Sequence, residues 1–220
     1  MLALYAITDR KCIGDRGLEY SVEQALSGGA TMIQLRDKEV DFDTLCKEAD
    51  SLLKICQKYN APLIINDNAD VVIKTGADGV HLGQNDMELA KAREILGKDK
   101  IIGGSARTIE LAKKAEQSIA DYIGSGAVFG TLTKADAKYL GTENLKKICG
   151  AVGIPVVAGP SEATAIGNIM IQALAAGTAK DIASMRQLIN RSISLETFYP
   201  EDAEVWDTAY LHFKQVTMNH

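Results

Sequence analysis

The segment LIINDNADVVIKTGADGVHL, residues 63–82, decides the fold class. It begins with the apolar run LIIN and ends with a second apolar run, GVHL, and a polar turn and a helical pattern lie between the two. A short strand, a helix and another short strand in this order are typical of a βαβ unit, in which the two strands run parallel. Because both runs are apolar at nearly every position, we expect strands that are buried on both faces of a sheet.

The same pattern extends in both directions along the chain, since each apolar run is followed by a turn and a helical stretch. The seven runs are LYAIT (4–8), MIQLR (32–36), LIIN (63–66), GVHL (79–82), IIGGS (101–105), YIGSG (122–126) and PVVA (155–158). Seven such repeats fit a TIM barrel better than an open sheet of about five or six strands, and a flavodoxin-like sheet is the structural alternative. The sequence therefore predicts an α/β fold of the TIM (β/α)8 type.

Several stretches between the runs have the apolar spacing of helices. They include 44–58, 108–118 and 143–150, and the last ends at Gly150, a residue suited to a helix C-cap. In the first stretch, the apolar residues that line one face are Leu45, Ala49, Leu52, Leu53 and Cys56.

The chain changes character after residue 158. An eighth strand should follow PVVA, and none is obvious there. Helical patterns follow instead: 163–177 is apolar nearly all round, 180–192 is amphipathic, and 200–216 opens with proline and two acidic residues. We therefore expect two parts, a barrel over residues 1–158 that is incomplete or atypical after its seventh strand, and a helical tail over 159–220.

The composition argues against nucleic-acid and membrane partners. The net charge is −5, which gives no basic surface for nucleic acid. No stretch approaches the ~20 apolar residues of a membrane span, and the N-terminus does not have the pattern of a signal peptide. The four cysteines are Cys12, Cys46, Cys56 and Cys149, and they are scattered without metal-ligand spacing. A reduced, cytoplasmic protein is therefore expected.

Polar residues cluster where the predicted strands end, which is where a barrel binds its ligands. Gln34, Arg36 and Lys38 alternate at the end of the second run, so they are expected to share one face of an extended segment. Two cations so placed suit an anionic group. A solvated strand end is an equally good interpretation of these residues alone.

The next two strand ends carry carboxylates. Asn66 and Asp67 follow LIIN directly, and Asp86 follows GVHL. Mg²⁺ prefers few carboxylates and shares its other positions with water and phosphate oxygens, so Asp67 and Asp86 are candidate metal ligands. Carboxylates near turns also serve as Asx caps, which is the interpretation that we favour for Asp70 and Asp78.

The later strand ends carry small and hydroxyl side chains. Ser105 ends the fifth run, and a loop with Thr131, Thr133 and Lys134 follows the sixth, which is a composition suited to phosphate. His81 lies inside the fourth run. A single strand histidine is more often packed, or orients a neighbour, than catalytic.

Five segments together resemble the thiamine phosphate synthase family. In chain order they are LYAITDR (4–10), GATMIQLRDK (29–38), INDNADVVIKTGADGVHLGQND (65–86), GGSART (103–108) and FGTLTK (129–134). The resemblance covers about residues 2–158 and is specific because five motifs agree at once. It implies a TIM barrel that joins 4-amino-5-hydroxymethyl-2-methylpyrimidine diphosphate to a thiazole phosphate, releases pyrophosphate and uses Mg²⁺.

The resemblance also implies roles for individual residues. The residues implied to hold the diphosphate are Gln34, Leu35, Arg36, Asp37 and Lys38. Asn66 and Ser105 would contact the pyrimidine, and Asp67 and Asp86 would bind Mg²⁺. Those implied for the thiazole phosphate are Thr131, Leu132, Thr133 and Gly159. The catalytic cations, which would stabilise the departing pyrophosphate, are Arg36, Lys38 and Lys134.

The segment GPSEATAIGN (159–168) departs from this family and resembles the C-terminal end of rhamnulokinase-like sugar kinases, over about 156–216. The sequence thus looks like a synthase body joined to a kinase tail, with part of the thiazole phosphate site replaced. The alternatives are a thiazole tautomerase-like relative and a non-catalytic interaction protein, and the chain is also a candidate homo-oligomer. A tautomerase has no need of the cation and carboxylate set.

Overall fold

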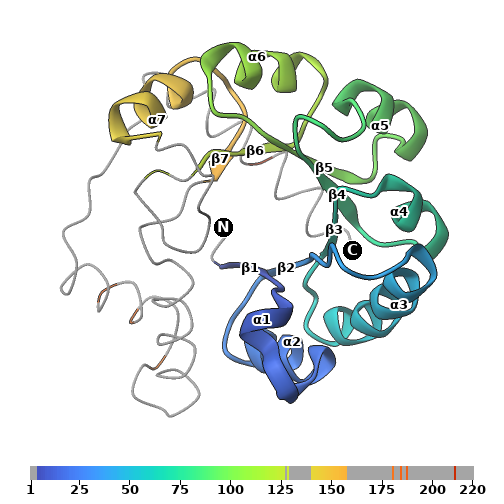
Figure 1. The fold of residues 1–220 in the computed structure, drawn as a ribbon. Coiled ribbons are helices and arrows are strands. Elements are labelled where there is room, and N and C mark those ends of the chain that lie inside the picture. The colour runs from blue at the N-terminus through green and yellow to red at the C-terminus, as the bar shows by residue number, and fades with distance from the viewer. Residues whose placement is uncertain are drawn as a thin grey trace. The chain divides into compact units, whose positions relative to one another are not determined.

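The computed structural model describes residues 4–126, 128, 140–157, 180, 184, 187 and 211 (Figure 1). The chain divides into two units. The first comprises residues 1–63 and 163–198, and the second comprises 64–162 and 199–220.

Two strands and their helices form the described core of the first unit. Its elements are β1 (Tyr5–Ile7), α1 (Arg10–Ile13), the 3-10 helix η1 (Gly14–Arg16), α2 (Leu18–Ser27), β2 (Met32–Leu35), α3 (Phe42–Lys58) and the first residue of β3 (Leu63–Asn66). Strand β1 pairs with β2 in parallel, so that Ile7 lies opposite Gln34. The backbone N–H of Ile33 in β2 donates to the carbonyl of Pro62, the residue directly before β3, at 3.1 Å.

The second unit continues the alternation of strands and helices. After the rest of β3 come α4 (Ala69–Thr75), β4 (Gly79–Leu82), α5 (Leu89–Leu96), β5 (Ile101–Ser105), α6 (Ile109–Gln117), β6 (Tyr122–Gly124), α7 (Thr142–Cys149) and β7 (Val156–Val157). The neighbouring strands from β3 to β7 all pair in parallel. In Figure 1, α4, α5 and α6 lie on the same side of the strands of this unit.

The strand order confirms the predicted TIM type. Over the described residues the sheet has the order β1-β2-β3-β4-β5-β6-β7, so each strand is hydrogen-bonded to the strands that precede and follow it in the chain. A doubly wound sheet reverses its order at a switch point, which this sheet does not do. The flavodoxin-like alternative is therefore wrong. The predicted domain boundary at 158, the missing eighth strand and the helical tail lie outside the described residues and stay predictions.

The helices begin and end where local chemistry directs them. Helix α3 starts after Asp41, whose carboxylate accepts the N–H of Thr44 at 2.8 Å. Thr108 caps α6 in the same way, and the N–H of Gly150 closes α7 on the carbonyl of Lys146. The face of α3 predicted to be apolar is buried at Leu45, Ala49, Leu52 and Cys56. Among the described residues, the helices lack the combination of length and apolarity needed to cross a bilayer.

Candidate active site

In the first unit, the end of β2 is fastened to β1 by polar groups. The side chain of Gln34 is buried, with 3% of the residue exposed, and its Nε2 donates to the Tyr5 hydroxyl at 2.6 Å. The Thr8 N–H donates to the carbonyl of Gln34 at 2.9 Å. Because a buried amide needs hydrogen-bond partners, Tyr5 fixes the side chain of Gln34, which is predicted to bind the diphosphate.

Thr8 also sets the course of the chain beyond β2. The Arg36 N–H donates to the Thr8 hydroxyl at 2.9 Å, and that hydroxyl lies 3.2 Å from the Arg36 carbonyl, to which it donates. Strand β2 ends at Leu35, so Arg36 and Lys38 lie beyond the strand, and the predicted alternation of Gln34, Arg36 and Lys38 on one face stays a prediction. Gln34 is buried, Arg36 is half-buried and Lys38 is exposed. Sequence reasoning missed Thr8, although it belongs to the quoted segment LYAITDR.

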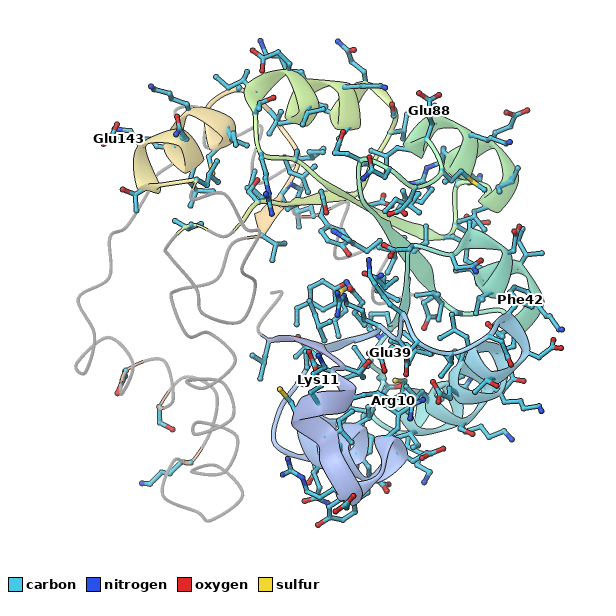
Figure 2. The ribbon with its side chains drawn as sticks, in the orientation of Figure 1. Arg10, Lys11, Glu39, Phe42, Glu88 and Glu143 are labelled. Carbon is cyan, nitrogen blue, oxygen red and sulfur yellow. The ribbon has the colours of Figure 1, made fainter. Side chains whose placement is uncertain are left out.

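Asp37, between the two predicted catalytic cations, is engaged by protein groups. Its carboxylate pairs with the Arg10 guanidinium, which also pairs with Glu48, and it accepts the N–H of Glu39 at 2.9 Å (Figure 2). The hydrogen bond to Asp37 raises the pKa of Arg10 above its usual value. Burial raises the pKa of Glu48, and Arg10 offsets only part of that rise. These contacts hold the turn that carries Arg36 and Lys38.

In the second unit, the residues after β3 form a tight turn. Asp67 has φ 64°, a left-handed conformation that aspartate and asparagine tolerate better than most residues. This conformation directs the Asp67 N–H to the carbonyl of His81 at 2.8 Å. Asn68 then caps α4 by accepting the N–H groups of Asp70 and Val71, so Asn68 and not Asp70 is the Asx cap here. Asn66 and Asp67 are both half-buried at this strand end.

The residues after β4 form a second turn that orients Asp86. The Asp86 Oδ2 atom accepts the N–H of Gly83 at 2.7 Å. A Cβ at position 83 would lie 2.9 Å from the same oxygen, so a larger residue there would push the carboxylate away. The side-chain amide of Gln84 donates to the carbonyl of Ser105. Asp86 is therefore held by one oxygen at the carboxyl end of β4.

Three side chains from neighbouring strands form a hydrogen-bonded series behind these turns. His81 Nε2 lies 3.0 Å from the Ser105 hydroxyl, and His81 Nδ1 lies 3.1 Å from the Tyr122 hydroxyl. The expectation that His81 packs or orients a neighbour agrees with these contacts. Tyr122 could not be selected from the sequence, because a tyrosine in an apolar run is indistinguishable from a core residue.

The carboxylates present fit a magnesium ion that is shared with a diphosphate. The described residues contain no group of three or more histidine, cysteine, aspartate or glutamate side chains that could hold a metal by themselves. Mg²⁺ uses one or two carboxylates and completes its shell with water and substrate phosphates. Asp67 and Asp86 follow β3 and β4, which are adjacent and parallel with Asn66 opposite His81. A pair of carboxylates after two adjacent strands matches that preference.

The remaining predicted residues lie outside the described part of the chain. They are Thr131, Leu132, Thr133, Lys134 and Gly159. Their roles toward the thiazole phosphate and the pyrophosphate stay predictions.

Comparisons with known proteins identify the family. The family model described as thiamine monophosphate synthase matches residues 4–188. A thiamine-phosphate synthase from Clostridium acetobutylicum is 51% identical over 154 residues, which cover 70% of this chain and 73% of that protein. One from Ruminiclostridium cellulolyticum is 48% identical over 154 residues, with the same coverage of 70% and 73%.

A solved structure extends the similarity to the fold. The thiamine phosphate pyrophosphorylase from Pyrococcus furiosus is 35% identical and has a TM-score of 0.68, covering 86% of this chain and 96% of its own. The family model extends 30 residues past the predicted boundary at 158, and the resemblance of the tail to sugar kinases stays a prediction. The predicted resemblance over the body of the chain and the predicted class of enzyme, a pyrophosphate-releasing transferase, are confirmed. The chain belongs to the thiamine monophosphate synthase family.

Proposed function

We propose that this chain condenses the pyrimidine diphosphate with the thiazole phosphate to give thiamine phosphate and pyrophosphate. The observation that carries the proposal is the match to this family, and charged groups that follow strands in each of the two units agree with it. The cations Arg36 and Lys38 follow β2, and the carboxylates Asp67 and Asp86 follow β3 and β4.

The charges suit the bond that must break. The bond between the pyrimidine methylene carbon and the diphosphate oxygen breaks, and its electron pair leaves with pyrophosphate. The thiazole nitrogen then donates its lone pair to the methylene carbon and forms the new C–N bond. Negative charge therefore develops on the leaving group, where Arg36 and Lys38 would stabilise it. No general base is required, since the nitrogen that attacks carries no proton.

Asp67 and Asp86 are the residues proposed to hold Mg²⁺. When bound, the ion would compensate charge on the diphosphate oxygens. Asp67 would contribute a carboxylate from the left-handed turn after β3, and Asp86 one that is oriented by the Gly83 N–H. The hydrogen bond from the Gly83 N–H to Asp86 Oδ2 orients this carboxylate at the carboxyl end of β4.

The cellular setting is part of the same proposal. A cytoplasmic location is supported by the spacing of the four cysteines, which are scattered along the chain without a metal-ligand or disulfide-framework pattern. The predicted homo-oligomer stays a prediction. The alternative of a non-catalytic interaction protein depended on the apolar segment 163–177, which lies outside the described residues.

The test uses the purified full chain with both substrates and Mg²⁺. We expect thiamine phosphate and pyrophosphate as products. Calorimetry with each substrate alone should show Mg²⁺-dependent binding of the pyrimidine diphosphate and weaker binding of the thiazole phosphate, because GPSEATAIGN (159–168) is predicted to replace part of the thiazole phosphate site. A folded chain that forms no product and binds neither substrate would overturn the proposal.

Two variants assign the metal role. Asp67→Asn keeps a residue that tolerates the left-handed conformation, and Asp86→Asn keeps an acceptor for the Gly83 N–H. Each should weaken the Mg²⁺-dependent binding about tenfold or more. The matched control is Asp70→Asn, an exposed residue in the first turn of α4, which should bind normally. Equal affinities for the pyrimidine diphosphate and Mg²⁺ in all three variants would show that Asp67 and Asp86 do not hold the ion.

A further inference from the structure

We propose that Tyr122 is a positioning residue for the pyrimidine site. Its hydroxyl donates to His81 Nδ1, holds the imidazole in the form protonated at Nε2, and so makes Ser105 a hydrogen-bond donor toward the substrate. The inference rests on the proposed function, because Ser105 is the predicted contact to the pyrimidine substrate.

The backbone register brings the three side chains together. His81 in β4 lies opposite Gly103 in β5, and Gly103 lies opposite Tyr122 in β6. His81 and Tyr122 are therefore separated by one intervening strand, at a position where that strand has no side chain. The hydroxyl of Tyr122 crosses this position and reaches His81 Nδ1 at 3.1 Å.

Two glycines leave the space that the series needs. A Cβ at Gly103 would lie 2.2 Å from Cζ of Tyr122 and 2.4 Å from its hydroxyl oxygen. A Cβ at Gly124 would lie 3.1 Å from Cε1 of His81. At position 103 any side chain would clash with the Tyr122 ring in its present place. At position 124 a side chain would displace the His81 imidazole. Both rings thus depend on positions that only glycine fills without movement.

The direction of the hydrogen bonds follows from the acidity of the groups. Neutral imidazole has one donor and one acceptor nitrogen, and the hydrogen bond made by one nitrogen sets which of them carries the proton. A phenol is a stronger acid than a neutral imidazole N–H, so Tyr122 donates and Nδ1 accepts. The proton then resides on Nε2, which donates to the Ser105 hydroxyl at 3.0 Å.

The consequence for the substrate is that the Ser105 hydroxyl accepts a hydrogen bond from His81 and donates its own hydrogen toward the substrate. A serine hydroxyl has one hydrogen and two lone pairs, and one lone pair is used by His81. The hydrogen is then directed elsewhere, toward an acceptor such as a ring nitrogen of the pyrimidine or an oxygen of its diphosphate. Tyr122 is fully buried, at 0% exposed, so its hydroxyl needs hydrogen bonds from protein groups, of which His81 Nδ1 is one.

Nitrogen NMR of the imidazole tests the first step without any activity. The chain has only three histidines, so the signals of His81 are readily assigned against variants of His212 and His220. At a pH of about 8.5, where an ordinary histidine is neutral, we expect His81 to be protonated at Nε2. Tyr122→Phe should give a mixture of the two forms. A parent His81 protonated at Nδ1, or a form unchanged in Tyr122→Phe, would overturn the proposal.

Kinetics test the second step. Tyr122→Phe keeps the ring packed beside Gly103 and should raise KM for the pyrimidine diphosphate about five- to tenfold, leaving KM for the thiazole phosphate unchanged. Ser105→Ala should do the same, and the double variant should lose no more than Ser105→Ala alone, because both changes act through one hydroxyl. The control is Tyr59→Phe at the exposed end of α3, which should match the parent.

The outcomes separate this proposal from the proposed function. If the increase in KM of the double variant equalled the product of the two single increases, Tyr122 would not act through Ser105, and the proposal would be overturned even if every variant were active. A parent chain without synthase activity that still shows Nε2–H at His81, and loses it in Tyr122→Phe, would overturn the proposed function and leave the positioning of Ser105 intact. If Tyr122→Phe did not fold, the protonated nitrogen in the parent would decide by itself.

Discussion

Arg10 in the first unit and Arg93 in the second perform the same kind of task in different surroundings. Arg93 is only 11% exposed in its side chain and pairs at 2.6 Å with Asp121, whose side chain is 5% exposed. Its other N–H groups donate to the carbonyls of Gly97, Lys100 and Ile119. Arg10 pairs with Asp37 and Glu48, but 48% of its side chain is exposed.

The two arginines also act at opposite ends of their strands. Asp121 precedes β6 and accepts the N–H of Ile102 at 2.7 Å, so Arg93 ties together the amino ends of β5 and β6. Arg10 follows β1 and holds Asp37, which follows β2. In TIM barrels the amino ends of strands serve stability and the carboxyl ends serve function. Arg93 therefore stabilises the fold, whereas Arg10 shapes the turn that carries Arg36 and Lys38, the predicted catalytic cations.

The largest effect is expected from Asp121→Ala. This change leaves the Arg93 guanidinium buried without its carboxylate and leaves the Ile102 N–H without its acceptor. We expect a loss of about 3–5 kcal/mol in the free energy of unfolding, measured by urea denaturation. The control is Asp50→Ala on the exposed side of α3, which should stay within about 0.5 kcal/mol of the parent. A loss below about 1 kcal/mol for Asp121→Ala would contradict the assignment.

A somewhat smaller loss is expected from Arg93→Lys. Lysine keeps the charge near Asp121 but cannot reproduce the planar fork that also reaches Gly97 and Ile119. The free energy of unfolding should fall by about 1.5–3 kcal/mol. The matched change Arg10→Lys should cost less than about 1 kcal/mol, since exposed pairs contribute little. Equal losses in the two variants would erase the distinction between the arginines.

Arg10→Ala is expected to affect function more than stability. Asp37 loses its partner, so the turn with Arg36 and Lys38 becomes less ordered and must be ordered again on binding. Unfolding should change by less than about 1 kcal/mol, whereas KM for the pyrimidine diphosphate should rise about tenfold. Steady-state kinetics measure the rise, and Lys11→Ala on the same helix is the control (Figure 2). An unchanged KM would separate Arg10 from the site.

The smallest effect concerns Glu48 and pH. Burial raises the pKa of Glu48 above the usual 4.5, and among the described residues its Oε2 has no hydrogen-bond partner. A raised pKa in an acid means that the stability from this group is full below the usual value and is lost as pH rises through the raised value. Glu48→Gln should therefore gain stability relative to the parent between pH about 4.5 and about 7. Urea midpoints at the two pH values measure this, and a relative loss would reverse the sign.

The strands illustrate how far local signals reach. The runs LIIN, GVHL and IIGGS coincide with β3, β4 and β5, because a continuous apolar run that is bounded by polar or glycine turns is a local pattern. MIQLR does not coincide with β2, which ends at Leu35. There the Thr8 hydroxyl accepts a hydrogen bond from the backbone N–H of Arg36. Because Thr8 lies 28 positions away, the spacing of residues around Arg36 does not predict this contact.

The candidate site shows the same division. Arg36, Asp67, Asp86 and Ser105 could be selected from sequence because each polar residue follows an apolar run, where a barrel exposes its ligand groups. Arg10 and Tyr122 could not be selected, since an arginine in a short helix and a tyrosine in an apolar strand have ordinary structural explanations. Their roles depend on which side chains they meet.

The sequence by itself determined the alternation of strands and helices, the parallel sheet and the strand ends that carry charge. Only the tertiary structure decided the partners: His81 meets Tyr122 across 41 positions, and Arg93 meets Asp121 across 28. The physical reason is that apolar periodicity and helix caps are set by residues a few positions apart. A partner is set by the register between strands and by the space that a glycine such as Gly103 leaves, and both exist only after the sheet has formed.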